Sequence, residues 1–187
     1  MPSDATEAEI SAIKNKAPEE RAILTIASES LNRPLGLYNR ISRAESSVIL
    51  VDIKGLTVVK LTVKPFKDVE LNGWASRHIG ALKDARLVSG YPGATFRPLR
   101  RITLAEFAAI VLRSEGISHT KPYDGKSYWA LGVISKVKEM SLLKDVQLFT
   151  VDDFKRSIDT EKAVELLSKT RSGAEKAQYL LDWERGY

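Results

Sequence analysis

Two segments of this 187-residue chain carry the same helix-start signature at a spacing of 61 residues. The segments are "ISRAE" (41–45) and "ITLAE" (102–106), and each places a hydroxyl residue three positions before a glutamate. This pattern predicts a capping box, in which the hydroxyl and the glutamate each accept a hydrogen bond from a backbone N–H at the helix start. Beyond the caps, both copies continue through matching apolar positions to a glycine stop, at Gly55 and Gly116. Such a duplication constrains the chain to fold as a helical repeat.

A third and weaker copy of the capped helix follows at "IDTEKAVELLSKT" (158–170). Asp159 has the side chain of a helix cap, but Lys162 stands where the other two copies have a glutamate. We therefore expect a capped helix without the reciprocal half of the box.

Each capped helix is preceded by another predicted helix. The segments "WASRHIGALKDARL" (74–87) and "WALGVISKVKEMSL" (129–142) share a tryptophan, an alanine and apolar residues on one helical face. In the first copy the equivalent helix is expected at 18–31, where Pro18 and two acids occupy the first turn. One helix pair cannot bury both of its faces. We therefore predict a mainly α fold, with three helix-loop-helix repeats packed as a pseudo-threefold helical bundle.

These repeats define the expected organisation of one compact domain. Its parts are predicted at 1–56, 57–117, 118–171 and 172–187. The first part includes an extra short helix at roughly 4–16, and the last part is an extra helix that starts after Gly173. The segment "TVVKLTVK" (57–64) is either a short strand or an extended linker.

Composition excludes several kinds of chemistry. The chain has no cysteine, which excludes disulfides, thiolate metal sites and a cysteine nucleophile. Hydrophobic residues make up 43% of the chain, enough for a core, but no apolar stretch is long enough to span a membrane. The formal net charge of +5 favours anionic partners. The start of the chain, "MPSDATEAEI", lacks the pattern of a signal peptide, so we expect a cytoplasmic protein or a mature or excised fragment of an exported one.

Catalytic and metal-binding signatures are also missing from the sequence. It contains no phosphate-binding loop, no zinc-protease motif and no hydrolase nucleophile motif. Asp152, Asp153 and Asp159 lack the regular spacing of a calcium loop, and His78 has no second histidine near it. We therefore expect a protein that is not an enzyme and has no catalytic residue, no metal and no cofactor.

The second repeat, taken as a whole, resembles an S-layer homology domain. Its residues 66–113 read "FKDV…WA…I…L…GYPGATFRP…ITLAEFAAIVLR", and these elements occur in the order typical of that family. The first repeat matches in its second half, "NRISRAESSVILVDIKGL", and the third repeat in its first helix and loosely in its second. The resemblance implies a three-pronged helical spindle at the cell wall or S-layer, outside the cell. It further implies non-covalent anchoring to an anionic, often pyruvylated, secondary cell wall polysaccharide linked to peptidoglycan, without nucleic acid and without membrane insertion.

The same resemblance implies a ligand groove between neighbouring repeats. An arginine of one repeat lines it, together with an acid, a tryptophan and the glycine loop of the next repeat. On this chain the ligand-binding residues are then Arg43, Asp68, Trp74, Gly90, Gly93, Ala94, Thr95 and Arg97. The arginine can bind a carboxylate through two charge-assisted hydrogen bonds, and the acid can accept from sugar hydroxyls. The indole offers a flat face to a sugar ring, the glycines allow close approach to backbone N–H groups, and Arg97, Arg100 and Arg101 raise the positive potential.

Several positions depart from the family pattern. The motif arginine is replaced by Leu104 in the second repeat and by Thr160 in the third. The usual Asp-Gly of the loop is Gly93-Ala94, and the third repeat has no glycine between Gly132 and Gly173. We therefore predict at most one strong polysaccharide site.

Simpler roles stay open for these residues, as do two other functions. Arg43 can be a solvated charge, Asp68 can tie down the turn in which it lies, and Trp74 can pack against a neighbouring repeat. The main alternative function is that of a degenerate module for protein–protein assembly in an S-layer or cell-envelope scaffold. An apolar surface patch in the tail would favour it, around Tyr179, Leu180 and Trp183. A nucleic-acid-binding protein would instead need a continuous basic stripe.

Overall fold

The computed structural model describes residues 6–119 and 127–186 of the chain. Over these residues the fold is mainly helical, and backbone pairing outside helices is limited to isolated bridges. The helices are α1 (Glu7–Lys14), α2 (Pro18–Ser30), α3 (Arg43–Lys54), α4 (Ser76–Asp84), α5 (Leu104–Ser114), α6 (Leu131–Glu139), α7 (Val151–Lys155), α8 (Thr160–Ser168) and α9 (Arg171–Glu184), with a 3-10 turn at Val146–Leu148.

The two predicted capping boxes are confirmed, at the N-termini of α3 and α5. The Ser42 hydroxyl accepts from the Glu45 N–H at 3.2 Å, and the Glu45 carboxylate accepts from the Ser42 N–H at 2.6 Å. Thr103 and Glu106 make the same reciprocal pair. At α8 only the forward half exists, since the Asp159 carboxylate accepts from a first-turn N–H at 3.0 Å. Each cap satisfies backbone donors that a helix start would otherwise leave without a partner.

Backbone hydrogen bonds join the three caps to one another. The first helical residue of each capped helix donates its N–H across to another cap segment: Arg43 to the Arg100 carbonyl (2.9 Å), Leu104 to the Arg156 carbonyl (3.0 Å) and Thr160 to the Asn39 carbonyl (2.9 Å). These bonds link the first cap segment to the second, the second to the third and the third to the first. Helices α3, α5 and α8 therefore all start from one closed junction.

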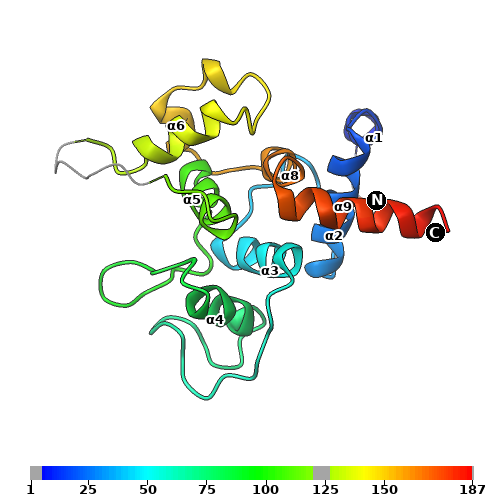
Figure 1. Cartoon of the computed structure of the whole chain (residues 1–187). Coiled ribbons are helices and arrows are strands. Elements are labelled where there is room, and N and C mark those ends of the chain that lie inside the picture. Colours follow the sequence, from blue (N-terminus) through cyan, green and yellow to red (C-terminus); the bar gives the residue numbers. More distant parts are fainter. Residues whose placement is uncertain (1–5, 120–126, 187) are drawn as a thin grey trace.

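The core surrounds this junction. Ile41, Ile102 and Ile158 lie one residue before the three caps and are almost completely buried. The Ile102 N–H donates to the Ile41 carbonyl at 3.1 Å, and its carbonyl accepts from the Ile158 N–H at 3.0 Å. Around this centre α2 packs against α3, α8 and α9, α4 packs on α3, and α6 packs on α5 (Figure 1). A single hydrophobic cluster runs through all of these elements.

Most predicted helices occur where they were expected, with two corrections. The predicted C-terminal helix starts at Arg171 and not after Gly173. Thr170 caps it by accepting from the Gly173 N–H at 3.1 Å, and a Cβ at position 173 would lie 1.9 Å from the Leu167 carbonyl oxygen. That glycine permits close packing inside the first turn and does not break the helix. In addition, Trp74 and Trp129 precede α4 and α6 and do not lie within them.

The connections between the helices settle points that the sequence left open. Residues 57–64 contain no strand and form no bridge with a described segment, so this stretch is a linker. Between α6 and α8, where the third loop is expected, the chain forms a 3-10 turn and α7, and Thr150 and Asp153 form a further capping box there. The segment "KPYDG" (121–125) lies outside the described residues. The division into three equivalent repeats, their pseudo-threefold packing and the boundaries between them stay predictions.

The junction yields a prediction about stability. Ile102→Ala removes a fully buried side chain from the centre of the fold, and we expect it to lower the free energy of unfolding by about 2–5 kcal/mol. Leu99→Ala is the matched control, because Leu99 lies three residues away and is 81% exposed, and its effect should stay within about 0.5 kcal/mol. Urea denaturation followed by circular dichroism measures both. Equal effects of the two substitutions would show that the junction is not the centre of stability.

Candidate functional site

The loop between α4 and α5 is a tight reversal closed by its own backbone. The Tyr91 N–H donates to the Thr95 carbonyl at 2.7 Å, and four loop residues have left-handed backbones. Gly90 (φ +75°) and Gly93 (φ +81°) adopt this conformation without a side chain, whereas Ala94 (φ +56°) and Arg97 (φ +59°) adopt it with one. The loop is therefore held in a conformation that needs external support.

Asp68 supplies part of this support. One of its carboxylate oxygens accepts from the Phe96 N–H and the other from the Arg97 N–H, both at 2.7 Å. Burial would raise the pKa of Asp68, but these two N–H groups and the Arg97 charge hold the pKa below its ordinary value. The neighbouring Lys67 N–H donates to the Ala94 carbonyl at 3.0 Å. Asp68 thus ties the segment before α4 to the end of the loop.

Arg43 approaches the same loop from α3. It is only 5% exposed, and its Nε donates to the Phe96 carbonyl at 2.8 Å. Its guanidinium carbon lies 4.5 Å from the centre of the Phe96 ring and 4.8 Å from that of Tyr91. Burial lowers the pKa of Arg43, and the nearby Tyr91 and Glu106 act in the opposite direction. Arg43 is therefore a buried cation that fastens the start of α3 to the 90–97 loop.

Glu106 connects the loop to the cap of α5. Its carboxylate accepts from the Tyr91 hydroxyl, from the Arg100 guanidinium and from the Thr103 N–H, and it lies 3.7 Å from Arg43 Nη1. Burial would raise the pKa of Glu106, but these hydrogen bonds and the charges of Arg43 and Arg100 hold the pKa below its ordinary value. One carboxylate thus serves as a helix cap and as the counter-charge of two arginines.

Gly90 is required by close packing as well as by conformation. A Cβ on Gly90 would lie 2.5 Å from Phe66 Cε1 and 2.6 Å from the Thr95 carbonyl oxygen. The Phe66 ring in turn stacks on Phe96, with 5.2 Å between the ring centres. A Cβ on Gly93, by contrast, would have no atom within 4 Å.

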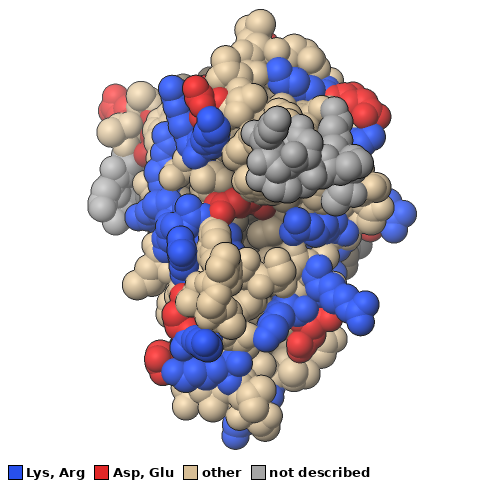
Figure 2. Space-filling model, turned by 90° about the vertical axis from the view of Figure 1, so that its left-hand side faces the viewer, with Lys and Arg blue, Asp and Glu red and all other residues tan. Residues whose placement is uncertain are grey.

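The structure therefore brings together most of the predicted site residues. Contacts join Arg43 and Asp68 to the loop that contains Gly90, Gly93, Ala94, Thr95 and Arg97. Trp74 is 61% exposed, and within the described part of the chain its ring has no stacking or cation–π partner. Figure 2 shows the face of the molecule that is at the left in Figure 1, where Lys and Arg side chains gather on both sides of a recess with acidic side chains at its centre.

Sequence reasoning missed two members of this cluster. Tyr91 lies within the quoted glycine loop, but no spacing rule indicates that its ring lies 4.4–5.2 Å from the guanidinium carbons of three arginines. Glu106 was predicted as a cap, and its second role depends on the tertiary fold. The residues at the matching positions of α5 and α8 are Leu104 and Thr160, and both are buried. Leu104 is a core side chain, and the Thr160 hydroxyl donates to the Asn39 carbonyl at 3.1 Å.

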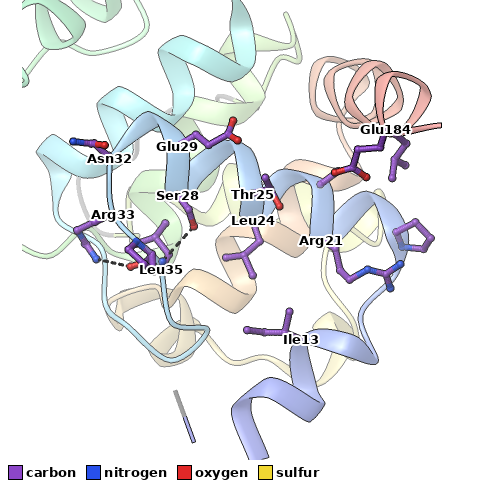
Figure 3. A pocket seen from close by; sticks show the side chains of 14 residues that line it. Ile13, Arg21, Leu24, Thr25, Ser28, Glu29, Asn32, Arg33, Leu35 and Glu184 are labelled. Atoms are coloured by element: carbon purple, nitrogen blue, oxygen red, sulfur yellow. Dashed lines mark hydrogen bonds between the residues drawn. The ribbon is translucent and has the colours of Figure 1, made fainter. Parts of the chain in front are cut away.

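A separate pocket lies on the other side of the fold. It has a volume of about 680 Å³ between α2, the segment that follows it and α9, and apolar side chains such as Leu24 and Leu35 line much of it (Figure 3). Both arginines that line the pocket already form hydrogen bonds. Arg21 donates to the Lys16 carbonyl at 2.6 Å, and Arg33 donates to the Glu45 carboxylate. None of the predicted site residues lines this pocket.

Three further features bear on function: metal-binding clusters, membrane-spanning helices and exposed aromatic residues in the tail. Within residues 6–119 and 127–186, no three His, Asp or Glu side chains gather in a way that could hold a metal ion. The described helices include none with the length and hydropathy needed to cross a membrane. In the tail, Tyr179 and Trp183 are exposed one turn apart on α9, whereas Leu180 is half-buried.

Taken together, these contacts define a helical protein in which Arg43, at the start of the capped helix α3, docks into the glycine loop that precedes α5. Comparison with known families matches residues 65–108 to the S-layer homology domain. The match to this family covers the glycine loop and the start of α5.

Similar proteins come from bacterial cell surfaces. The chain is 24% identical over 151 residues to the middle cell wall protein of Brevibacillus brevis, covering 77% of the chain and 14% of that protein. It is 25% identical over 152 residues to the surface layer protein of Brevibacillus choshinensis, covering 77% of the chain and 13% of that protein. It is 36% identical over 86 residues to the cellulosome-anchoring protein of Acetivibrio thermocellus, covering 43% of the chain and 19% of that protein. The chain thus spans less than a fifth of the length of each of these relatives.

The loop geometry predicts different effects for two glycine substitutions. Gly93→Ala places a side chain at positive φ in open space and should cost about 1–2 kcal/mol of stability. Gly90→Ala adds a clash with Phe66 and the loop backbone and should cost about 1–3 kcal/mol more. Thermal unfolding of both variants measures the difference. A Gly90→Ala variant as stable as Gly93→Ala would contradict the close packing described for this loop.

The lowered pKa of Glu106 predicts a pH dependence of stability. A carboxylate whose folded pKa lies below the unfolded value of 4.5 stabilises the fold above that pH and loses this contribution as the pH falls through the folded pKa. Between about pH 6 and about pH 3, the urea midpoint should therefore fall more steeply in the wild type than in Glu106→Gln. Glu139→Gln, at an exposed position, should keep the wild-type slope.

Proposed function

We propose that the chain is a non-enzymatic cell-surface anchoring module that binds an anionic, pyruvylated secondary cell wall polysaccharide beside the 90–97 loop. The observation that carries this proposal is the rigid loop, fastened from the first repeat by Arg43 and from its own repeat by Asp68. A loop braced on both sides is suited to present fixed groups to a ligand. The S-layer homology match lies over this loop, and the relatives named above are proteins of cell walls, surface layers and cellulosome anchoring.

The exposed groups around the loop suit a sugar acid. Trp74 presents an indole to solvent, which is the kind of flat surface on which a sugar ring packs. Arg97 is exposed at the end of the loop, and Arg101 is also largely exposed. We assign the predicted ligand-binding residues to this surface, with binding that weakens as salt increases because part of it is ionic.

The proposal includes a location and an architecture. The module acts outside the cell, associated with the cell wall or the S-layer, as part of a longer protein. The three repeats form the pseudo-threefold bundle, and the closed junction of the three caps supports this arrangement. Only the groove between the first and second repeats is assigned a strong site, because the positions that match Arg43 in the other two repeats hold Leu104 and Thr160 and not an arginine.

One observation favours a second function, in protein–protein assembly. Tyr179 and Trp183 are 70% and 69% exposed, and they lie four residues apart on α9. Residues four apart share one face of a helix, so the pair forms an aromatic surface suited to another protein. This surface is made by the extra C-terminal helix and is independent of the loop.

A cosedimentation assay tests the anchoring proposal. The purified chain is mixed with peptidoglycan sacculi that retain their wall polymer and with sacculi stripped of it by acid, each at two salt concentrations. We expect pelleting with intact sacculi only, and less of it at the higher salt. Pelleting with both preparations, or with neither, would be incompatible with recognition of the polymer.

Trp74→Ala separates the two functions. We expect about a tenfold loss of affinity for intact sacculi, because the substitution removes the exposed indole, with little change in stability. Trp183→Ala is the matched control, since this tryptophan is similarly exposed but lies on α9. If Trp183→Ala reduces pelleting and Trp74→Ala does not, the binding surface is the tail and not the loop.

A further inference from the structure

The backbone of Arg97 is unusual for a residue with a side chain. Its φ of +59° lies in the left-handed region, which favours glycine because a Cβ crowds the backbone there. Asp68 holds this conformation by accepting the Arg97 N–H at 2.7 Å. A non-glycine residue that is kept in a strained conformation by a dedicated hydrogen bond is a candidate for a functional role.

The three arginines around Tyr91 differ in what their charges meet. Arg43 is buried, and its Nε donates to the Phe96 carbonyl. Arg100 donates to the Tyr91 hydroxyl and to both oxygens of Glu106. Arg97, in contrast, is exposed and forms no ion pair with a described carboxylate. Its guanidinium carbon lies 4.4 Å from the Tyr91 ring centre, and its charge acts on Asp68 without a salt bridge.

We propose that Arg97 is the residue that contacts the acidic group of the wall polymer, and that Asp68 and Arg43 are positioning residues behind it. This inference rests on the proposed function and divides the roles within that site. A guanidinium can bind a carboxylate through two parallel hydrogen bonds, which fits a sugar acid or a pyruvyl group. The Tyr91 ring packs against the Arg97 guanidinium, and the two hydrogen bonds that Asp68 accepts from the Phe96 and Arg97 N–H groups fix the backbone from which this side chain leaves the loop.

The first test removes the guanidinium and relieves the strain in one step. Arg97→Gly should weaken binding to intact sacculi at least tenfold, because it removes the guanidinium. It should leave the melting temperature unchanged or higher, because glycine adopts this φ without steric strain. Arg86→Gly is the matched control, since Arg86 is also an exposed arginine with a left-handed φ of +58° but lies at the end of α4. It should have a similar effect on the melting temperature and change binding by less than twofold.

The second test uses the sign of an effect. Asp68→Asn removes a negative charge from the site, so a site that binds anions only through its positive potential would bind more tightly after the change. A site that depends on Asp68 to position Arg97 would bind severalfold more weakly. In the Arg97→Gly background, Asp68→Asn should have little further effect on binding, because two residues that act through one contact are not additive.

The outcomes distinguish this inference from the proposed function. If the wild-type chain does not pellet with intact sacculi, the proposed function fails and this inference fails with it. If the wild type pellets and Arg97→Gly pellets equally well, only the inference is overturned, and Arg43 becomes the residue to replace. Tighter binding by Asp68→Asn would likewise overturn the positioning role and leave the anchoring function intact.

Discussion

The backbone hydrogen bonds that join the three cap segments are the constraint on which the rest of the structure depends. Each first helical residue donates its N–H to a carbonyl of another cap segment, so the helix starts are fixed relative to one another before any side chain is considered. Buried backbone groups must find partners, and here each cap satisfies the needs of its neighbour. Since α3 begins at this junction, residue 43 necessarily lies beside the chain that leads into α5.

From this geometry follows a site with two layers. The inner layer is buried and ionic, and consists of Arg43, Glu106 and the Tyr91 hydroxyl packed between α3 and α5. A buried cation is tolerated only when it is paired and hydrogen-bonded, and the Phe96 carbonyl and Glu106 provide this here. The outer layer consists of Trp74 and Arg97, whose side chains are left to solvent. The inner layer fixes the loop, and the outer layer is free to meet a ligand.

The features that could be predicted from the sequence are those set by local physical chemistry. Both capping boxes, the Asp159 cap, the left-handed glycine at the end of α3 and most helix spans depend on neighbours within one or two turns. The prediction for Gly173 was wrong, because the lack of space for a side chain beside the Leu167 carbonyl depends on how α8 turns into α9. The absence of glycine between Gly132 and Gly173 indicated that the third loop would differ, but it did not indicate that α7 would form there.

The candidate site depended still more on the tertiary fold. Position 43 and the loop were predictable as a pair through the resemblance to S-layer homology domains. Sequence alone did not show that Arg43 is buried. Nor did it show that both carboxylate oxygens of Asp68 accept hydrogen bonds from the loop backbone. Both facts follow from the way that the loop packs in the folded chain. For Asp68, the simpler role of tying down a turn matches the contacts that the structure contains.

The junction also accounts for the difference between the repeats. At this junction the first residue of each of the three capped helices donates an equivalent backbone hydrogen bond, so the backbone alone treats positions 43, 104 and 160 alike. The side chains differ because their neighbours differ. Arg43 meets a loop carbonyl and two aromatic rings, whereas Leu104 is a core residue beside α7, and Thr160 is bonded to the Asn39 carbonyl. An arginine buried at position 104 would need a carbonyl and a carboxylate to receive it, and the loop that supplies the carbonyl to Arg43 has been replaced there by a helix. The same junction therefore holds a buried arginine at one helix start, a core leucine at the second and a hydrogen-bonded threonine at the third.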